Sequence, residues 1–545
     1  MARPVTFSPP RQLLSPLPRF RQPARRAAPA ILAAFLLAVL LAGGGCGGGE
    51  APAGSRALIV GVDSNPTSLD PRLSQDAISW QLQRLLFRQL LAYDASGAAA
   101  LDAAEAWEAS PLVHRFRLKE GIRFHDGSPL TSADVKFTFD SIRDPAMGSP
   151  KAAALRELAA IETPSPREVA FHLKRPSASF PEALMVGIVP RSAAGAGKDF
   201  GSRPVGTGPF RFVRFVPDEK IELAAFAGHP APPEFERLIF RILPEETIRI
   251  LELESGGLHL LQSTFSPDFL PRLETHPRLR VQSRPGTNFT YIGFNLRDPI
   301  LAKPKVRRAI ALAIDRDPII RHILKGLARK ADGLLPRGHW AHAPGLPALH
   351  HDPARARQLL DEAGFPDPDG PGPLPRFALV FKTSQSEIRR RTASVIADQL
   401  ARVGIEVKVR AYEWGTFFGD IRTGNFQLYS LTWVGISDPD IYRFVFHSAQ
   451  APPEGLNRGR YSNRRVDGLV EEAQRVLDRG RRAPLYHEVQ RILAEDLPYV
   501  NLWHAENAAA LDRRIEGFEV YPNEDLISLA RARFAPAGSR AGEKP

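Results

Sequence analysis

The stretch FRLKEGIRFHDGSPLTSADVKFTFDSI, residues 116–142, carries the strongest local structure signals in the chain. Apolar and charged side chains alternate in its first part, over residues 116–119 and again over residues 122–125. Alternation with a period of two is typical of strands that bury one face. The sequence therefore predicts two short half-buried strands joined by a turn at Glu120-Gly121.

The second part of the same stretch predicts a helix. Thr131 and Asp134 have the spacing of a capping box, in which the side chains at the helix start satisfy free backbone N–H groups. Apolar residues follow at helical spacing at Val135, Phe139 and Ile142. We expect this helix to stop before Asp144-Pro145, because a residue that precedes proline is disfavoured in helical geometry.

This stretch resembles the signature of the family 5 extracellular solute-binding proteins, the peptide- and nickel-binding receptors of bacterial ABC importers. Six further family-like segments follow in the family's order: PVGTGPF (204–210), FNLRDP (294–299), VRRAIALAIDR (306–316), DPARARQLLDEAGF (352–365), IADQLARVGIEVKV (396–409) and LTWVGISDPD (431–440). The resemblance covers residues 58–532. It implies an α/β, two-lobed periplasmic-binding-protein-like fold of type II, of the large class with an extra inserted subdomain.

The first 45 residues read as an export signal. Six arginines and no acid precede an apolar run at residues 30–42, which is too short for a membrane span of about 20 residues. Cys46 follows at once and is the only cysteine, so no intramolecular disulfide is possible. We expect Cys46 to be the lipidated first residue of a mature lipoprotein, with 46–57 as a flexible linker. A buried free cysteine does not suit its glycine-rich surroundings.

The resemblance also implies a domain layout. Lobe I would be discontinuous and would consist of residues 58–80, 190–290 and 506–535. Residues 81–189 would form the inserted subdomain and residues 291–505 would form lobe II. Residues 536–545 would form a disordered tail. The leucine spacing over residues 80–91 predicts a helix, and Asp352 followed by Pro353 predicts the start of another. Interleaved helix and strand patterns between residues 352 and 409 agree with an α/β lobe.

The charge pattern argues against nucleic acid as a partner. The formal charge is +12 for the whole chain, and removal of the six leader arginines leaves +6, spread among acids. No basic block with interleaved aromatic residues occurs. Gly206 and Gly208 lack the lysine of a phosphate-binding loop, so we expect them to permit a tight turn.

Catalytic, metal and cofactor sites are not predicted. Four histidines share one proline-rich loop, but no acid or cysteine supports them at the usual ligand spacing: His339, His342, His350 and His351. No G-x-S-x-G nucleophile motif occurs. We therefore expect a binding protein without cofactor or metal, not an enzyme.

The candidate ligand site comes from the resemblance. Aromatic residues near strands are more often core, but in the family the segment equivalent to 433–436 lines the cleft, where an extended ligand adds to exposed backbone. Gly435 would permit its close approach. The residues expected to bind ligand are Ser64, Asn65, Tyr412, Trp414, Trp433, Val434, Gly435, Ile436, Ser437 and Asp438.

The implied function is solute capture for an ABC importer. A peptide or peptide-like solute would bridge the lobes, stabilise the closed state and be delivered to permease subunits in the inner membrane. The protein would be a monomer on the periplasmic side of the cell envelope, held by its lipid anchor. Two alternatives stay open: a solute-sensing lipoprotein of the same fold without its own transporter, and a secreted hydrolase.

One position separates this chain from the peptide-binding members. There an acidic residue just after the W-x-G turn pairs with the ligand's free amino group, whereas here Ile436 and then Ser437 occupy that place. An unpaired ammonium in a closed cleft costs several kcal/mol, on the order of the penalty for any buried charge. Either Asp438 takes the role or the ligand has no free amine there. We favour the second option, so free-amine dipeptides should bind weakly.

Overall fold

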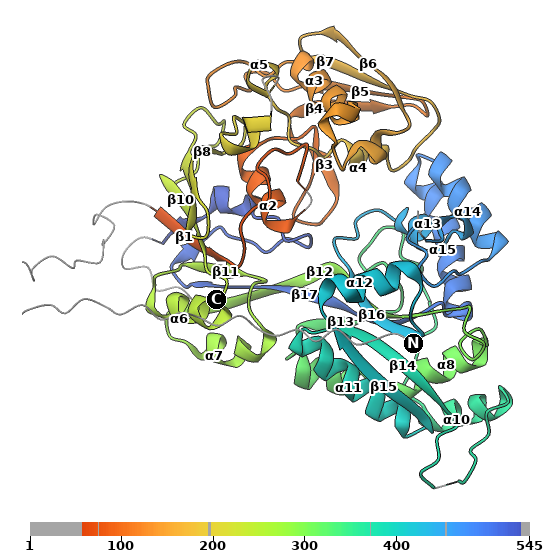
Figure 1. The fold of residues 1–545 in the computed structure, drawn as a ribbon. Coiled ribbons are helices and arrows are strands. Elements are labelled where there is room, and N and C mark those ends of the chain that lie inside the picture. The colour runs from red at the N-terminus through yellow and green to blue at the C-terminus, as the bar shows by residue number, and fades with distance from the viewer. Residues whose placement is uncertain (1–56, 75, 195–197, 371, 453–454, 536–545) are drawn as a thin grey trace, which may run out of the picture. The chain divides into compact units, whose positions relative to one another are not determined.

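The computed structural model describes residues 57–74, 76–194, 198–370, 372–452 and 455–535 (Figure 1). In it, residues 116–142 start in strand β5 (Val113–Leu118) and end in helix α3 (Ser132–Arg143). The Thr131 N–H donates to Asp134 Oδ2 at 2.9 Å, which forms the capping box and fixes the first turn. The predicted helix is confirmed, and it ends one residue before Asp144.

The second predicted strand, at residues 122–125, is wrong. Only a single bridge joins Arg123 to Pro129 there. The chain reverses within those few residues, since the Phe124 N–H donates to the Ser128 carbonyl at 2.8 Å. The alternation still marked the buried side chains correctly, because Ile122 and Phe124 lie in a hydrophobic core.

A four-stranded antiparallel sheet surrounds β5. Its strand order is β4-β5-β7-β6, with β4 at Ala104–Ala109, β6 at Leu158–Ser165 and β7 at Glu168–Leu173. The hairpin β2 (Leu91–Tyr93) and β3 (Ala99–Leu101) lies just before it in the sequence. Side chains from Leu90 to Ile188 make one hydrophobic cluster with this sheet and α3. This part of the chain therefore has its own core.

The largest sheet in the described part of the chain has eleven strands, in the order β15-β14-β16-β12-β17-β11-β1-β10-β9-β8, with β13 paired to β17. Its strands are β1 (Ala57–Val62), β8 (Phe210–Val216), β9 (Lys220–Ala225), β10 (Arg237–Ile242), β11 (Leu260–Gln262), β12 (Leu279–Phe294), β13 (Ala328–Lys330), β14 (Phe377–Ser384), β15 (Ile405–Tyr412), β16 (Leu428–Trp433) and β17 (Tyr499–Asp512). Two short strands, β18 (Ile515–Glu516) and β19 (Arg533–Phe534), pair separately.

The long strands β12 and β17 connect the two ends of this sheet, as Figure 1 shows. The C-terminal half of β17 pairs with β11, and its N-terminal half pairs with β13. The C-terminal half of β12 pairs with β16. The β12–β17 pairing is interrupted between Pro285 and Phe289, where the register shifts. A bulge of this kind bends a strand and exposes backbone groups for other partners.

Helices cover both faces of the β14–β16 end. On one face a hydrophobic cluster joins α8 (Pro304–Ala313), α10 (Pro353–Glu362) and α11 (Glu387–Ala401) to the sheet. On the other face a second cluster joins α12 (Trp414–Thr423), α13 (Ile441–Phe446), α14 (Arg464–Arg475) and α15 (Arg479–Asp496). The remaining helices are α2 (Ala77–Leu86), α4 (Phe180–Ala183), α5 (Arg191–Ala194), α6 (Glu246–Ser255), α7 (Leu270–Thr275) and α9 (Arg316–Pro318).

The chain bends at residues 207–209, although neither Gly206 nor Gly208 has a positive φ. Their role is close approach: a Cβ on Gly206 would lie 1.9 Å from the Leu86 carbonyl oxygen. The Gly208 N–H donates to that same oxygen at 2.8 Å. This contact coincides with the end of α2 at Leu86, whereas residues up to 91 read as helical in the sequence.

The predicted signal peptide, the Cys46 anchor with residues 46–56 of its linker, and the 536–545 tail lie outside the described residues. Ala57, the last residue of the predicted linker, is described and begins β1. Within residues 57–535 as described, no helix is long and apolar enough to cross a membrane.

Candidate functional site

The loop that follows β16, residues 433–440, lies against the bulge of β12. The Gly435 N–H donates to Asn288 Oδ1 at 2.9 Å, and the Ile436 N–H donates to the Thr287 carbonyl at 3.3 Å. Gly435 has φ of 66°, which favours glycine, and nothing lies within 4 Å of where its Cβ would be. Val434 is 75% exposed. The backbone at 434–435 is therefore fixed on one side and open on the other.

Strand β16 has a free edge next to this loop. Its ladder with β14 ends at Tyr429, although β14 continues to pair with β15 as far as Ser384 and Tyr412. Beyond Ser430, β16 therefore has a strand partner only on the β12 side, among the described residues. A free strand edge offers N–H and C=O groups to an extended ligand.

The two predicted tryptophans belong to one aromatic array. Trp414, 53% exposed, stacks on Phe418 with ring centroids 5.5 Å apart. Trp433 stacks on Tyr291 at 6.1 Å. The guanidinium of Arg458 lies between the two stacks, 5.3 Å from the Phe418 ring and 4.5 Å from the Trp433 ring. Trp433 therefore packs in the core on one side and reaches a buried cation on the other.

A cavity of about 710 Å³ lies beside Ile436 and Ser437. Its wall comes from the β2–β3 turn, the β12 bulge, β13, the 336–339 segment and β17. Its charged lining residues are Arg284, Arg329, Lys330, Arg337 and Glu506. A volume of this size suits a small solute or a short peptide segment.

A second cavity, of about 340 Å³, lies between Ser437-Asp438 and residues of the β2–β5 region. Here the Tyr93 hydroxyl lies 2.6 Å from Ser437 Oγ and 2.7 Å from Glu182 Oε1. The Ala178 N–H donates to the Gln474 carbonyl at 2.9 Å. Residues on the two sides of this cavity are thus already linked by hydrogen bonds.

The Asp438 carboxylate forms an ion pair with a neighbouring arginine. Arg482 donates to both of its carboxylate oxygens, at 3.0 and 3.2 Å, and the Asp440 N–H adds a third bond at 2.7 Å. Both partners of the ion pair are largely buried. Burial and the negative charge of Asp438 raise the pKa of Glu182 to about 8, so Glu182 is largely protonated at neutral pH. Neither carboxyl group is a free counter-charge for an ammonium.

His339 is a hydrogen-bonding group of this site. His339 Nε2 lies 2.9 Å from the Ser437 carbonyl oxygen, and its Nδ1 accepts the Ala341 N–H. Burial lowers the pKa of His339. In the described part of the chain, no three His, Cys, Asp or Glu side chains gather as metal ligands.

Ser64 and Asn65 lie apart from the two cavities. Asn65 Nδ2 donates to Asp218 Oδ1 at 2.5 Å, and the Asp218 N–H donates back to Asn65 Oδ1 at 2.9 Å. The Ser64 hydroxyl donates to its neighbour Asp63. The structure therefore joins Ile436, Ser437 and Asp438 at cavities, joins Trp414 and Trp433 in the aromatic array, and leaves this pair near the β8–β9 turn.

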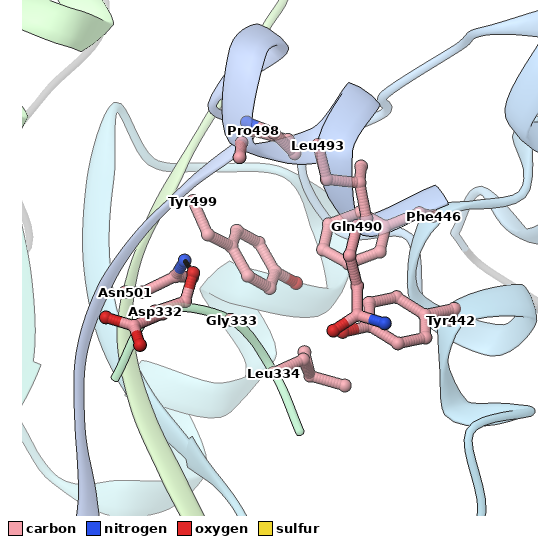
Figure 2. A pocket seen from close by; sticks show the side chains of 11 residues that line it. Asp332, Gly333, Leu334, Tyr442, Phe446, Gln490, Leu493, Pro498, Tyr499 and Asn501 are labelled. Atoms are coloured by element: carbon pink, nitrogen blue, oxygen red, sulfur yellow. Dashed lines mark hydrogen bonds between the residues drawn. The ribbon is translucent and has the colours of Figure 1, made fainter. Parts of the chain in front are cut away.

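A small internal cavity of about 20 Å³ lies deeper in the core (Figure 2). Tyr442, Tyr499 and Gln490 surround it in the close-up, together with Asp332 and Asn501 at one side. It has room for about one water molecule. It is a packing feature and not a ligand site.

The comparison with family models identifies the same family as the seven family-like segments of the sequence. Residues 99–452 match the model of the bacterial extracellular solute-binding proteins, family 5 middle region. The chain belongs to this family. The family consists of binding proteins, and its members are extracellular or periplasmic.

Relatives of this solute-binding protein match over nearly their full length. The oligopeptide-binding protein AppA of Bacillus subtilis is 27% identical over 501 residues, which covers 87% of this chain and 91% of AppA. The dipeptide-binding protein of Escherichia coli is 24% identical over 500 residues and covers 86% and 93%.

Solved structures show the same fold. AppA of B. subtilis in complex with a nonapeptide aligns with TM-score 0.73 and 26% identity, covering 88% of this chain and 99% of AppA. The substrate-binding protein CtaP of Listeria monocytogenes aligns with TM-score 0.80 and 22% identity, covering 88% and 99%. The solute-binding protein therefore has the two-lobed α/β fold of type II that its sequence predicted.

Three residues of the site were missed in the sequence: Tyr93, Asn288 and Arg458. Tyr93 ends a three-residue strand and contacts Ser437, 344 positions away. Arg458 stands in a loop without regular pattern, and its ring partners Phe418 and Trp433 come from other elements. No local periodicity could reveal contacts that depend on the long-range packing of the solute-binding fold.

Proposed function

We propose that this chain captures a peptide or peptide-like solute beside β16 and delivers it to the permease of an ABC importer. The observation that carries the proposal is the free edge of β16 beyond Ser430, which lies just before a cavity-lining loop. Extended peptides bind such edges through main-chain hydrogen bonds, and side-chain pockets add selectivity. AppA and the dipeptide-binding protein support the peptide class as relatives.

The ligand-binding residues of this proposal fall into two groups. Trp433, Val434 and Gly435 would provide the edge, and Ile436 and Ser437 would provide the cavity wall. Tyr412 and Trp414 would flank the far end of the edge, since β15 ends at Tyr412 and α12 begins at Trp414. Asp438 would hold the loop through Arg482. Ser64 and Asn65 would contribute only if closure brings the β8–β9 turn toward the ligand.

Hinge closure is the proposed mechanism. The hydrogen bonds of Tyr93 with Ser437 and of Ala178 with Gln474 join residues 81–189 to residues 291–505, which are the proposed subdomain and lobe II. Ligand that contacts both sides would stabilise the closed form by its differential contacts. The proposed anchor at Cys46 would keep the receptor on the periplasmic face of the membrane.

Mass spectrometry of the solute that copurifies after native expression tests the function. We expect a peptide or peptide-like solute, which on re-addition compacts the stripped protein in small-angle scattering and raises its melting temperature. Tight binding without a change in radius of gyration would contradict closure. Cys46→Ser should release the protein into the soluble periplasmic fraction, and wild-type protein without lipid by mass would contradict the anchor.

A further inference from the structure

Seven arginines are buried in the described part of the chain, and six of them have strong acceptors. Three pair with carboxylates: Arg72 with Asp70, Arg84 with Asp525 and Arg482 with Asp438. Three others each donate to at least three backbone carbonyl groups: Arg249, Arg307 and Arg316. Each of these six buried guanidinium groups is thus surrounded by hydrogen-bond acceptors. This is expected, because burying a charge without partners costs free energy.

Arg458 is the seventh buried arginine, and it has neither a carboxylate partner nor a set of backbone carbonyl acceptors among the described residues. It is 8% exposed, and among the described residues its side chain donates only to the neutral Tyr291 hydroxyl, 3.1 Å from Nη1. No carboxylate of the described residues acts on its charge. The rings of Trp433 and Phe418 attract the cation but accept no ordinary hydrogen bond.

A second donor at the same place also lacks an acceptor. The indole Nε1 of Trp433 is buried and makes no hydrogen bond with the described residues. The Arg458 guanidinium carbon lies 4.5 Å from the centre of that ring. One group that accepts hydrogen bonds and carries negative charge would satisfy the indole N–H and the open guanidinium N–H groups together.

Arg458 and Trp433 lie at the free edge of β16, where the ligand is proposed to bind. Trp433 is the last residue of β16, at the end of its free edge. On the other side of the guanidinium, Phe418 stacks on the exposed Trp414. The guanidinium therefore lies between the rings of Trp433 and Phe418, next to the backbone to which an extended ligand would add.

We propose that Arg458 and the indole N–H of Trp433 bind an anionic group of the solute, a carboxylate or another oxyanion. This rests on the proposed function and names its substrate class: a solute with negative charge near the β16 edge. Arg458 is then a specificity-determining residue, because a neutral solute would leave its guanidinium without a negatively charged partner.

Calorimetry with matched N-acetylated tripeptides tests the proposal. One pair is acetyl-trialanine and its amide, and the other is acetyl-Ala-Glu-Ala-amide and its Gln counterpart, so each pair differs by one carboxylate. We expect wild type to prefer the carboxylate member of at least one pair by tenfold or more. Arg458→Met should reduce that preference below threefold, chiefly by lowering the affinity for the carboxylate member. Arg390→Met is the matched control, because exposed Arg390 pairs with Glu387 on α11 and should keep the preference.

Other outcomes overturn the proposal. Equal affinity within both pairs, a preference that persists in Arg458→Met, or equal weakening of both members, as a purely structural role would give, each contradict it. If no tripeptide binds, the copurified solute decides: an anionic solute lost from Arg458→Met supports the proposal, and a neutral or cationic solute overturns it while solute capture stands. If no solute copurifies or binds, solute capture itself fails and this inference with it.

Discussion

Arg482 and Arg458 are buried on either side of the same loop, residues 433–440, and differ in one respect. Both stack over aromatic rings: Arg482 over Tyr486 at 5.3 Å and Arg458 over Trp433 at 4.5 Å. Arg482 donates to both carboxylate oxygens of Asp438, whereas Arg458, among the described residues, donates only to a tyrosine hydroxyl. The chain completes one site and leaves the other open. A charge that folding does not neutralise is available to a ligand, and this distinction separates a structural ion pair from a recognition site.

Removal of Arg482 should have the largest effect on stability. Arg482→Met leaves Asp438 buried without its partner, which we expect to cost about 3–5 kcal/mol of unfolding free energy. Urea unfolding measures the change. Arg481→Met is the control, since Arg481 is exposed on the same helix and should change stability by less than about 0.5 kcal/mol. A loss from Arg482→Met no larger than this control would show that the completed ion pair is not what fixes the loop.

Glu182 should make stability depend on pH through the same charge cluster. Its pKa rises from an ordinary 4.5 to about 8 through burial and Asp438, with Arg482 opposing and with the Tyr93 and Ser437 hydroxyls beside it. The folded chain therefore holds a proton that the unfolded chain releases above about pH 4.5, so this contribution is complete below 4.5 and is lost as pH rises toward 8.

Glu182→Gln should remove that dependence. Between about pH 5.5 and 7.5, we expect wild type to lose about 2–3 kcal/mol more stability than the variant. Urea unfolding of both proteins across this range measures the difference and cancels the groups that they share. Parallel pH profiles would show that Glu182 ionises freely and that the Asp438–Arg482 pair does not reach it.

Arg458→Met should cost far less stability than Arg482→Met, within about 1 kcal/mol of wild type, because it removes a buried charge and strands no carboxylate. An increase in stability would agree with the same reasoning. Urea midpoints of the two variants, measured side by side, test the comparison directly. A loss of several kcal/mol from Arg458→Met would mean that this arginine is held as firmly as Arg482.

Local signals predicted those parts of the fold that short segments decide. The capping box of α3 and the Asp352-Pro353 start of α10 depend on side chains a few positions apart, and both helices begin as expected. The early end of α2 follows from a contact with Gly208, more than a hundred positions away. The same limit applies to the site. The W-x-G turn at residues 433–435 was visible in the sequence, but Arg458 was not. Its partners Tyr291, Phe418 and Trp433 come together only in the folded chain.

The smallest effect should come from blocking the amino end of a ligand. Ile436 stands where peptide-binding members have an acid, and Asp438, the only nearby substitute in sequence, already binds Arg482 through both oxygens. A free ammonium would therefore meet no available carboxylate here, and N-acetylation of a peptide should change its affinity by less than about threefold, which corresponds to about 0.6 kcal/mol. Titration calorimetry with a free and an acetylated tripeptide measures this. Asp438→Asn, which keeps the shape of the side chain, should leave the ratio of the two affinities unchanged even though it weakens the Arg482 pair. If the free peptide binds tightly and both acetylation and Asp438→Asn abolish that binding, then Asp438 serves the ligand and not Arg482, and the contrast between the two arginines fails.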